Sequence, residues 1–464
     1  MNEDTREITD IILAAADKAR ADTAGIEDPD PVSKVDWPLS CIVGPGLEGA
    51  IACESKIGYV NGAKGWLIYR GYDIFDLAAH SCFEEVAFLL LNGAVPSRSE
   101  LAAFRRELNS FLHIPRTKRQ LIAYPVEEMS PMAAIRFGLD LMRQSQTYRD
   151  APDALPSGPP IASDEDSIPM ETVPRGEQKA IYEFRGRAVK KKSRKAADAS
   201  RDLLGAEDLE SCCRLISGIC TLTATVARVR QNRMPLEPDP DLGHAANLLY
   251  MITGRRPTPE EARIMDVALI LHADHGMNAS TFAALVVAST LSDIYFSIGA
   301  GVAALSGPLH GGANEQALYM LEEIGGPAKV KPWYKKARAE NRKIMGIGHR
   351  VYKAYDPRAR VLGPLAEYLA SKNKSIAPLY ATAKALETQA AADLGKDKKL
   401  FPNVDFYSGI VYAGLGVSPE LFTPLFAVSR VAGWTARVFE YLQHNRIFRP
   451  RAIYTGDFNK RLKR

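Results

Sequence analysis

The stretch that decides how this chain folds and what chemistry it can perform is Met345-Gly-Ile-Gly-His-Arg-Val-Tyr-Lys353. Two related stretches flank it, Leu305-Ser-Gly-Pro-Leu-His-Gly-Gly-Ala-Asn314 and Phe401-Pro-Asn-Val-Asp-Phe-Tyr-Ser-Gly409. Each places one proton-exchanging side chain beside residues that bend the backbone, namely His349, His310 and Asp405. Carbon-acid chemistry requires a base that takes a proton from carbon and donors that hold the resulting enolate. The three stretches therefore predict a site for that chemistry.

The composition is that of an ordinary globular protein. The chain has 464 residues, of which 46% are hydrophobic and 25% are charged, and this length allows two or three domains. The 59 basic and 55 acidic residues give a net charge of +4, which does not argue for a nucleic-acid binder. Local basic pockets that attract anionic small molecules remain possible.

The cysteines and the start of the chain indicate a cytoplasmic protein. The six cysteines include no C-x-x-C pair, so neither a zinc site nor a redox motif is indicated, and free thiols in a reducing cytoplasm are expected. The acidic start, Met1 to Glu7, does not resemble a secretory or transit peptide. The best apolar run, Phe282 to Leu291, is too short to span a membrane.

Hydrophobic spacing predicts a mainly α-helical protein with a small β region near the N-terminus. Residues 40–72 combine glycines with β-branched residues and are expected to form short strands and turns. Asn314 is a candidate N-cap for one of the helices. Helices are expected at 5–20, in the region 74–112, and at 130–147, 208–231, 242–254, 259–272, 279–297, 314–324, 332–343, 358–371, 375–394 and 418–444.

Residues 148–205 interrupt this pattern. Six prolines and six acidic residues lie between Asp150 and Pro174, and seven basic residues follow within 185–195. Such a segment buries too little apolar surface to offset its ordering entropy, so we interpret it as a mobile insertion. The basic run could contact an acidic partner or a nucleic acid, but a solvated charged loop is the simpler interpretation.

Two further motifs point to cofactor or metal sites that their context does not support. Gly299-x-Gly301-x-x-Ala304 matches a dinucleotide fingerprint, but Gly307-Pro308 would break the helix that must follow it. A helix that ends in a glycine turn is the better interpretation. The spacing within His272-Ala-Asp-His275 does not match a helical metal-binding pair. His275 is instead expected to form hydrogen bonds at a helix end, in either a structural or a ligand-binding role.

Three basic residues could attract an anion to the predicted site. Lys353 and Arg358 follow His349 and favour carboxylates or phosphates. Arg430 lies on an apolar helical stretch, where its charge is costly unless it meets a substrate anion or an internal carboxylate. The aromatic pair after Asp405, Phe406-Tyr407, could desolvate that carboxylate and raise its basicity.

The combined motifs resemble those of the citrate synthase family: His272–Ser280 (HADHGMNAS), Gly307–Asn314 (GPLHGGAN), Met345–Ala359 (MGIGHRVYKAYDPRA), Asn403–Gly409 (NVDFYSG) and Arg449–Gly456 (RPRAIYTG). The resemblance runs from about Gly44 to Gly456, apart from the insertion. It implies a citrate synthase-like two-domain helical fold. Residues 1–312 and 411–464 would form a large domain, and residues 313–410 a small domain that closes over the cleft. It also implies a cytoplasmic homodimer, with a hexamer possible.

The resemblance assigns a role to each candidate residue. Asp405 matches the base that takes a methyl proton from acetyl-CoA, and His310 matches the donor to the thioester oxygen. His349 matches the residue that polarises the oxaloacetate ketone. The positions that match oxaloacetate ligands are His275, Arg358, Arg430 and, from the neighbouring subunit, Arg449. Lys353 matches a position that contacts CoA phosphates.

The expected activity is that of an acyltransferase, a citrate synthase of the tricarboxylic acid cycle. Acetyl-CoA and oxaloacetate would be its substrates, with no permanently bound cofactor, no metal, and no nucleic-acid or membrane partner. Two alternatives remain at this point. One is a 2-methylcitrate synthase that uses propionyl-CoA, because one methylene changes discrimination by only ~1–3 kcal/mol. The other is a non-catalytic paralogue that binds a metabolite.

Overall fold

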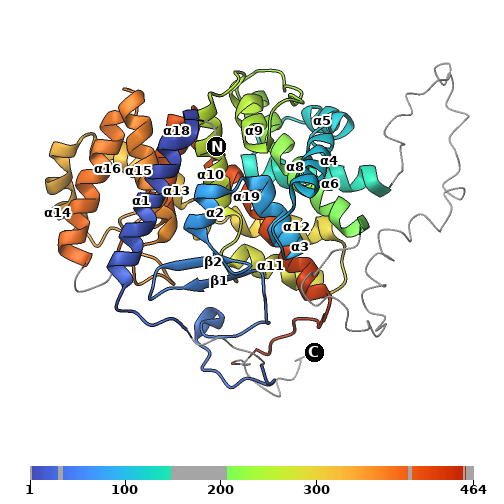
Figure 1. Ribbon diagram of the computed structural model, residues 1–464, viewed down its shortest axis with the longest axis horizontal. Coiled ribbons are helices and arrows are strands. Elements are labelled where there is room, and N and C mark those ends of the chain that lie inside the picture. The colour runs from blue at the N-terminus through green and yellow to red at the C-terminus, as the bar shows by residue number, and fades with distance from the viewer. Residues whose placement is uncertain (1–2, 30–34, 148–205, 396–399, 453–454, 456–464) are drawn as a thin grey trace, which may run out of the picture.

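The computed structural model describes residues 3–29, 35–147, 206–395, 400–452 and 455. The segment interpreted as an insertion, 148–205, lies outside these ranges. Within them the chain is mainly helical, with one small antiparallel sheet near the N-terminus (Figure 1), which confirms the predicted fold class.

The sheet has three short strands in the order β1-β2-β3. They are β1 (Gly58–Asn61), β2 (Trp66–Tyr69) and β3 (Tyr72–Asp73), and each pairs antiparallel with the next. Leu67 and Tyr69 are fully buried, whereas their neighbours on β2 are only half-buried. This period of two is expected for a sheet with one face on the core. The Tyr69 hydroxyl donates to the carbonyl of Asp274 over 2.8 Å, so the sheet supports the turn that carries His275.

Most helices form one large group. These helices are α2 (Ile74–His80), α3 (Phe83–Asn92), α4 (Arg98–Phe111), α5 (Pro115–Ile122), α6 (Pro131–Thr147), α8 (Ala206–Arg230), α9 (His244–Thr253), α10 (Pro259–His272), α11 (Ala279–Ser289), α12 (Ile294–Leu305) and α19 (Phe422–Leu442). Local signals start several of them. Ser97 and Glu100 form a capping box at α4, and Thr258 and Glu261 form another at α10.

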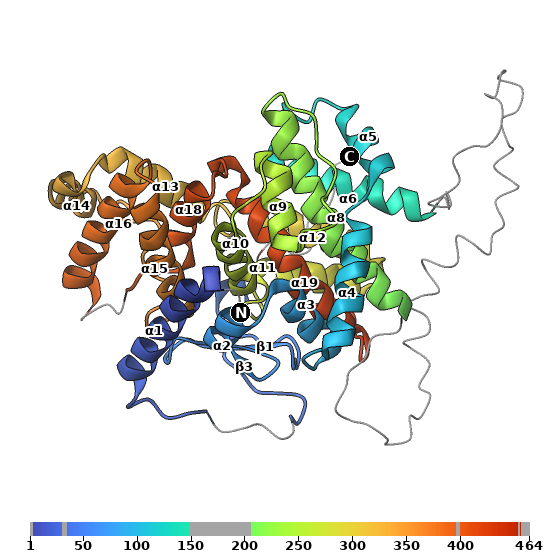
Figure 2. The same cartoon turned by 45° about the horizontal axis from the view of Figure 1, so that its top comes forward.

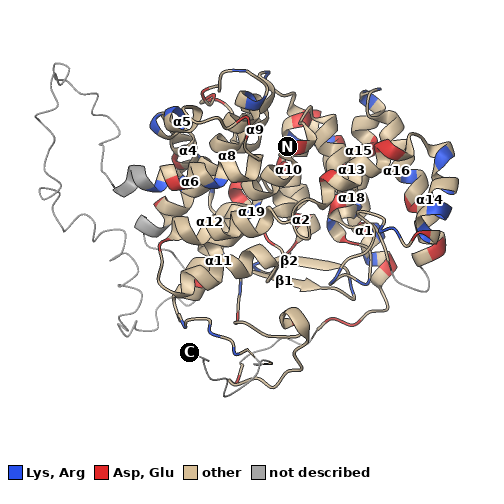
Figure 3. Ribbon diagram, turned by 180° about the vertical axis from the view of Figure 1, so that it is seen from behind, with Lys and Arg blue, Asp and Glu red and all other residues tan. Residues whose placement is uncertain are grey.

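A second group of helices gathers at one end of the molecule (Figures 1 and 2). It comprises α13 (Ala313–Ile324), α14 (Val330–Ala339), α15 (Pro357–Lys372), α16 (Ala377–Ala390), which continues into a π-helical turn at Ala391–Gly395, and α18 (Val404–Gly414). The N-terminal helix α1 (Arg6–Thr23) packs against both α15 of this group and α2 of the large group. Many of the charged residues lie on peripheral helices such as α14 (Figure 3).

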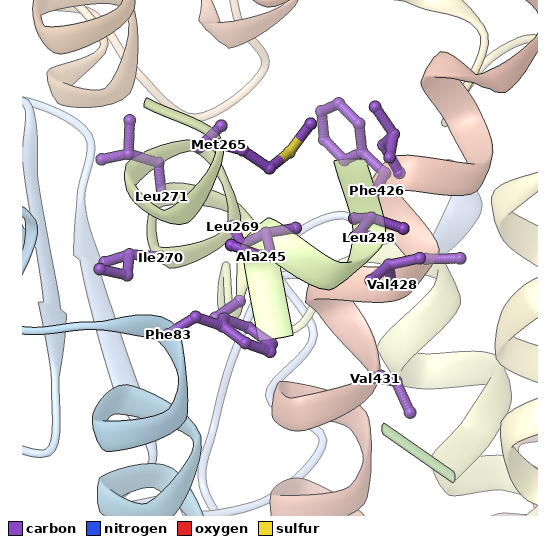
Figure 4. Close-up of a cluster of buried hydrophobic side chains, with 14 of the residues drawn as sticks. Phe83, Ala245, Leu248, Met265, Leu269, Ile270, Leu271, Phe426, Val428 and Val431 are labelled. Atoms are coloured by element: carbon purple, nitrogen blue, oxygen red, sulfur yellow. The ribbon is translucent and has the colours of Figure 1, made fainter. Parts of the chain in front are cut away.

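The core of the large group lies around α10 and α19. Figure 4 shows Met265 and Leu269 of α10 close to Leu248 of α9 and Phe426 of α19, and all four side chains are buried. Gly433 lets α19 approach the end of α10, since a Cβ at this position would lie 2.3 Å from the carbonyl oxygen of Ala273. The same packing that forms the core therefore brings α19 beside the turn that follows α10.

Two helix predictions were wrong in detail. Residues 279–297 form two helices, because Leu291 takes a left-handed conformation (φ 65°) and Asp293 caps α12 by accepting a hydrogen bond from Phe296 N. Asn314 does not cap α13. Gly312 is the N-cap, and Asn314 is buried in the first helical turn. The helices α5 and α18 were not predicted.

Two other segments bear on the sequence motifs. The match to the dinucleotide fingerprint at 299–304 lies inside α12, which ends at Leu305, so these glycines are part of a helix, as predicted. Among the residues that the structure describes, the apolar helix that is long enough to cross a membrane is Leu209–Arg230 of α8 rather than the predicted best run, and most of it is buried inside the protein as a core helix.

Candidate active site

His275 and His349 come from different groups of helices and meet face to edge. His275 lies in the turn between α10 and α11, and His349 lies in the loop before α15. Their ring centroids are 5.4 Å apart at an interplanar angle of 74°. Tyr352 completes the cluster, since its hydroxyl lies 3.2 Å from His275 Nε2 and its ring centroid is 4.8 Å from that of His349. The structure thus brings these two predicted residues together.

The hydrogen bonds of His349 fix its tautomer. Its Nδ1 accepts from the backbone N–H groups of Val351 (3.0 Å) and Tyr352 (3.1 Å). An N–H can only donate, so the proton of the neutral ring must lie on Nε2. Burial, the largest influence, lowers the pKa of His349 to about 4, so the ring is neutral at pH 7. His349 is therefore a neutral Nε2–H donor.

His310 is held in the opposite tautomer. It lies in the turn between α12 and α13, and its Nε2 accepts from the backbone N–H of Ser280 (3.2 Å) and lies 2.8 Å from the Ser280 hydroxyl. The proton of the neutral ring is therefore on Nδ1. Burial, together with the charge of Arg430 as a smaller influence, lowers the pKa of His310 to about 4. His310 is thus a second neutral donor.

Asp405 lies in the first turn of α18. The N-cap residue Asn403 accepts from Asp405 N (2.9 Å), donates through Nδ2 to the carbonyl of Gly348 (2.7 Å), and donates through its backbone N–H to Gly346 O (2.9 Å). Asn403 therefore fastens the helix of Asp405 to the loop of His349. Burial raises the pKa of Asp405 to about 7, the charge of Asp356 adds to the rise, and Arg358 is the largest influence that opposes it. The result is a carboxylate with unusual basicity.

Glycine at 346 permits this close approach of the loop to α18. It has a φ of +77°, and a Cβ there would lie 2.8 Å from Phe406 Cα. Any side chain would therefore be strained by the left-handed conformation and would push against the helix backbone.

Two buried arginines supply positive charge. Arg358 makes two hydrogen bonds to the Asp356 carboxylate, at 3.0 and 2.8 Å. Arg430 donates through Nε to the carbonyl of His272 (2.5 Å), and no described carboxylate lies within ion-pair distance of it. Burial lowers the pKa of Arg430 to about 10, and the charge of Arg358 contributes. A buried cation without an acidic partner is poised for an anion.

The Arg430 charge links the other predicted residues. It lowers the pKa values of His275, His310 and Asp405, in each case as a smaller influence than burial. These three residues come from the α10–α11 turn, the α12–α13 turn and α18. The structure therefore brings six of the eight predicted residues into one region. They are His275, His310, Asp405, Arg358, Arg430 and His349, the last of which packs against His275.

The two remaining predicted residues are exposed. Lys353 lies near His349, whose pKa it lowers slightly, and its backbone N–H donates to Gly62 O (2.8 Å). Arg449 lies in the segment that follows α19, where neighbouring Phe448 packs against Phe282 at 5.5 Å. Arg449 makes no hydrogen bond or ion pair with the other predicted site residues of its own chain, all of which the structure describes.

Sequence reasoning missed the residues that orient the site. Ser280, Asn403, Asp356 and Tyr352 were not predicted, although Asn403 and Asp356 carry a visible signal as Asn and Asp before helices that start at the next residue. The residues of the possible metal motif have separate partners instead of sharing one site. His272 Nδ1 contacts Ala268 O, and Asp274 is paired with Arg437. In the described part of the chain, no group of three potential metal ligands occurs.

Comparison with known proteins gives one consistent family. The family model "Citrate synthase, C-terminal domain" matches residues 46–451. Curated citrate synthases from Deinococcus radiodurans and Synechocystis are 39% and 40% identical over 414 residues. Each alignment covers 89% of this chain, and they cover 96% and 91% of those proteins.

Solved structures agree with this. The citrate synthase from Pyrobaculum aerophilum superposes with a TM-score of 0.75 at 36% identity, covering 93% of this chain and 98% of that one. The Thermoplasma acidophilum citrate synthase, solved as a ternary complex with carboxymethyl coenzyme A and oxaloacetate, superposes with a TM-score of 0.75 at 31% identity, covering 91% of this chain and 98% of that one. The chain belongs to the citrate synthase family.

Proposed function

We propose that this protein condenses acetyl-CoA with oxaloacetate and water to give citrate and free CoA. The observation that carries the proposal is the position of Arg430, a buried guanidinium whose charge lowers the pKa values of His275, His310 and Asp405. A dianionic keto acid held there would lie between one basic carboxylate and neutral imidazole donors. The relatives compared above are named citrate synthase, so the propionyl-CoA alternative is not favoured.

Asp405 would begin the reaction by taking a proton from the methyl group of acetyl-CoA. With a pKa of about 7, this carboxylate is more basic than an ordinary aspartate and still largely ionised just above neutral pH. A base alone contributes only about 10²–10⁴-fold. The remaining stabilisation would come from His310, whose Nδ1–H would donate to the thioester oxygen as the enolate forms.

His349 would act on the second substrate. Its Nε2–H would donate to the ketone oxygen of oxaloacetate while the enol carbon attacks the ketone carbon, and it would protonate the new alkoxide. The product of this step is citryl-CoA. Water would then attack the thioester carbonyl and return a proton to the His349 ring. The proton held by Asp405 would pass to the departing CoA thiolate, so that citrate and the CoA thiol are released and both side chains are restored. Neutral rings suit this role because they donate without attracting the substrate carboxylates away from the arginines.

The carboxylates of oxaloacetate would be held by His275, Arg358, Arg430 and an Arg449 supplied by a second copy of the chain. Charge-assisted hydrogen bonds of this kind contribute about 1.5–3 kcal/mol each. Exposure of Arg449 supports this assignment. Lys353, exposed and close to His349, would contact CoA phosphates.

The sharing of Arg449 makes the proposed active unit a homodimer. We further propose that residues 313–410 form a small domain that closes on residues 1–312 and 411–464, because closure would exclude water from the enolate. The grouping of α13–α16 and α18 at one end of the molecule supports this division. The six free cysteines support a cytoplasmic location.

The test is an assay of CoA release from acetyl-CoA and oxaloacetate, run in parallel with propionyl-CoA. We expect kcat/KM to be higher with acetyl-CoA. The acyl-CoA preference is wrong if propionyl-CoA is the better substrate. The absence of CoA release with either thioester, in protein that still binds oxaloacetate, would favour the non-catalytic alternative.

A further inference from the structure

Glu387, on α16, lies outside the site described above but is hydrogen-bonded to two segments that build it. Its side chain is only 12% exposed. The carboxylate accepts from the hydroxyl of Tyr355, from the hydroxyl of Tyr407 (2.7 Å), and from Lys384 Nζ (3.0 Å). A buried carboxylate is costly unless donors surround it, and here two of the three donors are tyrosines.

Each tyrosine lies within two residues of a residue that builds the site. Tyr355 immediately precedes Asp356, whose carboxylate binds Arg358 and also accepts from Val404 N (3.1 Å). Tyr407 is two residues after Asp405 on α18. One carboxylate on a third helix therefore holds both the segment of the substrate-binding arginine and the helix of the base.

The protonation states keep these bonds in place at neutral pH. Burial, and then the charge of Glu387, raise the pKa values of Tyr355 and Tyr407 above their usual value. Burial also acts to raise the pKa of Glu387, but the hydrogen bonds from the tyrosines and Lys384 outweigh it, and the pKa is lowered. The carboxylate is thus ionised and both phenols remain donors.

Packing leaves one side of these side chains open. A cavity of about 310 Å³ is lined by Tyr355, Tyr407 and Glu387, and also by Ile11 and Ala15 of α1. A ring that borders a cavity has few contacts on that side. Its hydrogen bond then adds to the restraint from packing on its other sides, where Tyr407 meets the ring of Phe406 and Tyr355 meets that of Phe401.

We propose that Glu387 is a positioning residue for the condensation, which holds Tyr355 and Tyr407 and thereby sets the position of Arg358 relative to Asp405. This role rests on the proposed function. Because reacting groups must be aligned closely, a shift of about 1 Å can cost up to 10²-fold in rate. Glu387 itself would touch neither substrate.

The experiment compares steady-state constants of the full-length protein with those of single variants. Tyr407→Phe removes only the hydroxyl on the helix of the base, so we expect kcat to fall roughly 10-fold with little change in KM for oxaloacetate. Tyr355→Phe should mainly raise KM for oxaloacetate, also roughly 10-fold. Glu387→Gln should show both effects.

Lys384→Gln is the matched control, because Lys384 donates to the same carboxylate but is mostly exposed and adjoins neither site segment. Its constants should stay within about twofold of the wild type. Adding Tyr407→Phe to Glu387→Gln should lower kcat by much less than it does alone, since the bond is already lost. If Glu387→Gln does not fold, the two tyrosine variants carry the test.

The inference is wrong if Glu387→Gln or both tyrosine variants keep wild-type kcat and KM. It is also wrong if Lys384→Gln is impaired as much as Glu387→Gln. A wild-type protein that released no CoA would instead refute the proposed function, so the two failures are distinguishable.

Discussion

Replacing Asp405 by Asn tests the electrostatics of the proposed base most directly. The change keeps the shape of the side chain and removes its charge. Burial raises the pKa of Asp405 from 3.8 to about 7, a difference that corresponds to about 4 kcal/mol against the ionised form in the folded protein. Asp405 is half-buried, and solvent screening lowers both the pKa shift and this cost, so we expect a gain of about 2–4 kcal/mol in the asparagine variant.

The direction in which the free energy of unfolding changes with pH follows from proton binding by Asp405. Between about pH 4 and pH 7 the folded protein holds a proton on Asp405 that the unfolded chain has released, so this group lowers the free energy of unfolding as pH rises. The asparagine variant carries no such cost. Its gain in stability should therefore grow across this window and then stay constant at higher pH.

Thermal unfolding of both proteins from pH 4.5 to pH 8.5 measures this gain, and CoA release measures the loss of catalysis. We expect kcat to fall by about 10²–10⁴-fold, while oxaloacetate still raises Tm in the variant because its ligands are intact. A variant that is destabilised at pH 8, or whose gain does not depend on pH, would refute the burial argument. Near-normal kcat would show that Asp405 is not the base.

Two other variants test the shared site and the buried ion pair. Arg449→Ala should raise KM for oxaloacetate roughly 10- to 100-fold. When the Arg449→Ala and Asp405→Asn proteins are mixed under conditions of subunit exchange, about a quarter of wild-type activity should return. Half of the dimers then contain one subunit of each variant, and each of these dimers holds one intact site. Activity in a genuinely monomeric preparation, or no recovery in exchanged dimers, would contradict the sharing. Asp356→Asn leaves the buried Arg358 without its carboxylate and should cost about 3–5 kcal/mol of stability in a denaturation experiment. An unchanged midpoint would mean that the pair contributes little.

Long periodic helices could be predicted from the sequence because their local signals agree. For α10, the cap Thr258, Pro259 in the first turn and Glu261 all mark the same start, and the predicted range, 259–272, matches. The break between α11 and α12 could not be predicted in this way. The apolar pattern continues through it, and only the left-handed Leu291 and the cap at Asp293 interrupt the helix.

In the candidate site, too, features within one short motif could be predicted, whereas contacts between residues far apart in the sequence could not. The proton-exchanging residues stand in motifs that are visible in the sequence, but the contacts that set their tautomers and positions are not visible there. Ser280 is 30 residues from His310, and the Asn403 side chain reaches Gly348 across 55 residues. Such pairs arise from packing between helices, which hydrophobic spacing does not encode.

The attachment of Asn403 to Gly346 and Gly348 has a consequence for how the enzyme could be controlled. The proposed base Asp405 and the loop of His349, the residue proposed to polarise the ketone, are fastened to each other, whereas His310 and Arg430, the proposed enolate donor and anion ligand, belong to other elements. A small rotation between the two sets of helices would leave each half internally unchanged and still separate the groups that must act together. Turnover could then be stopped and restarted by relative orientation alone.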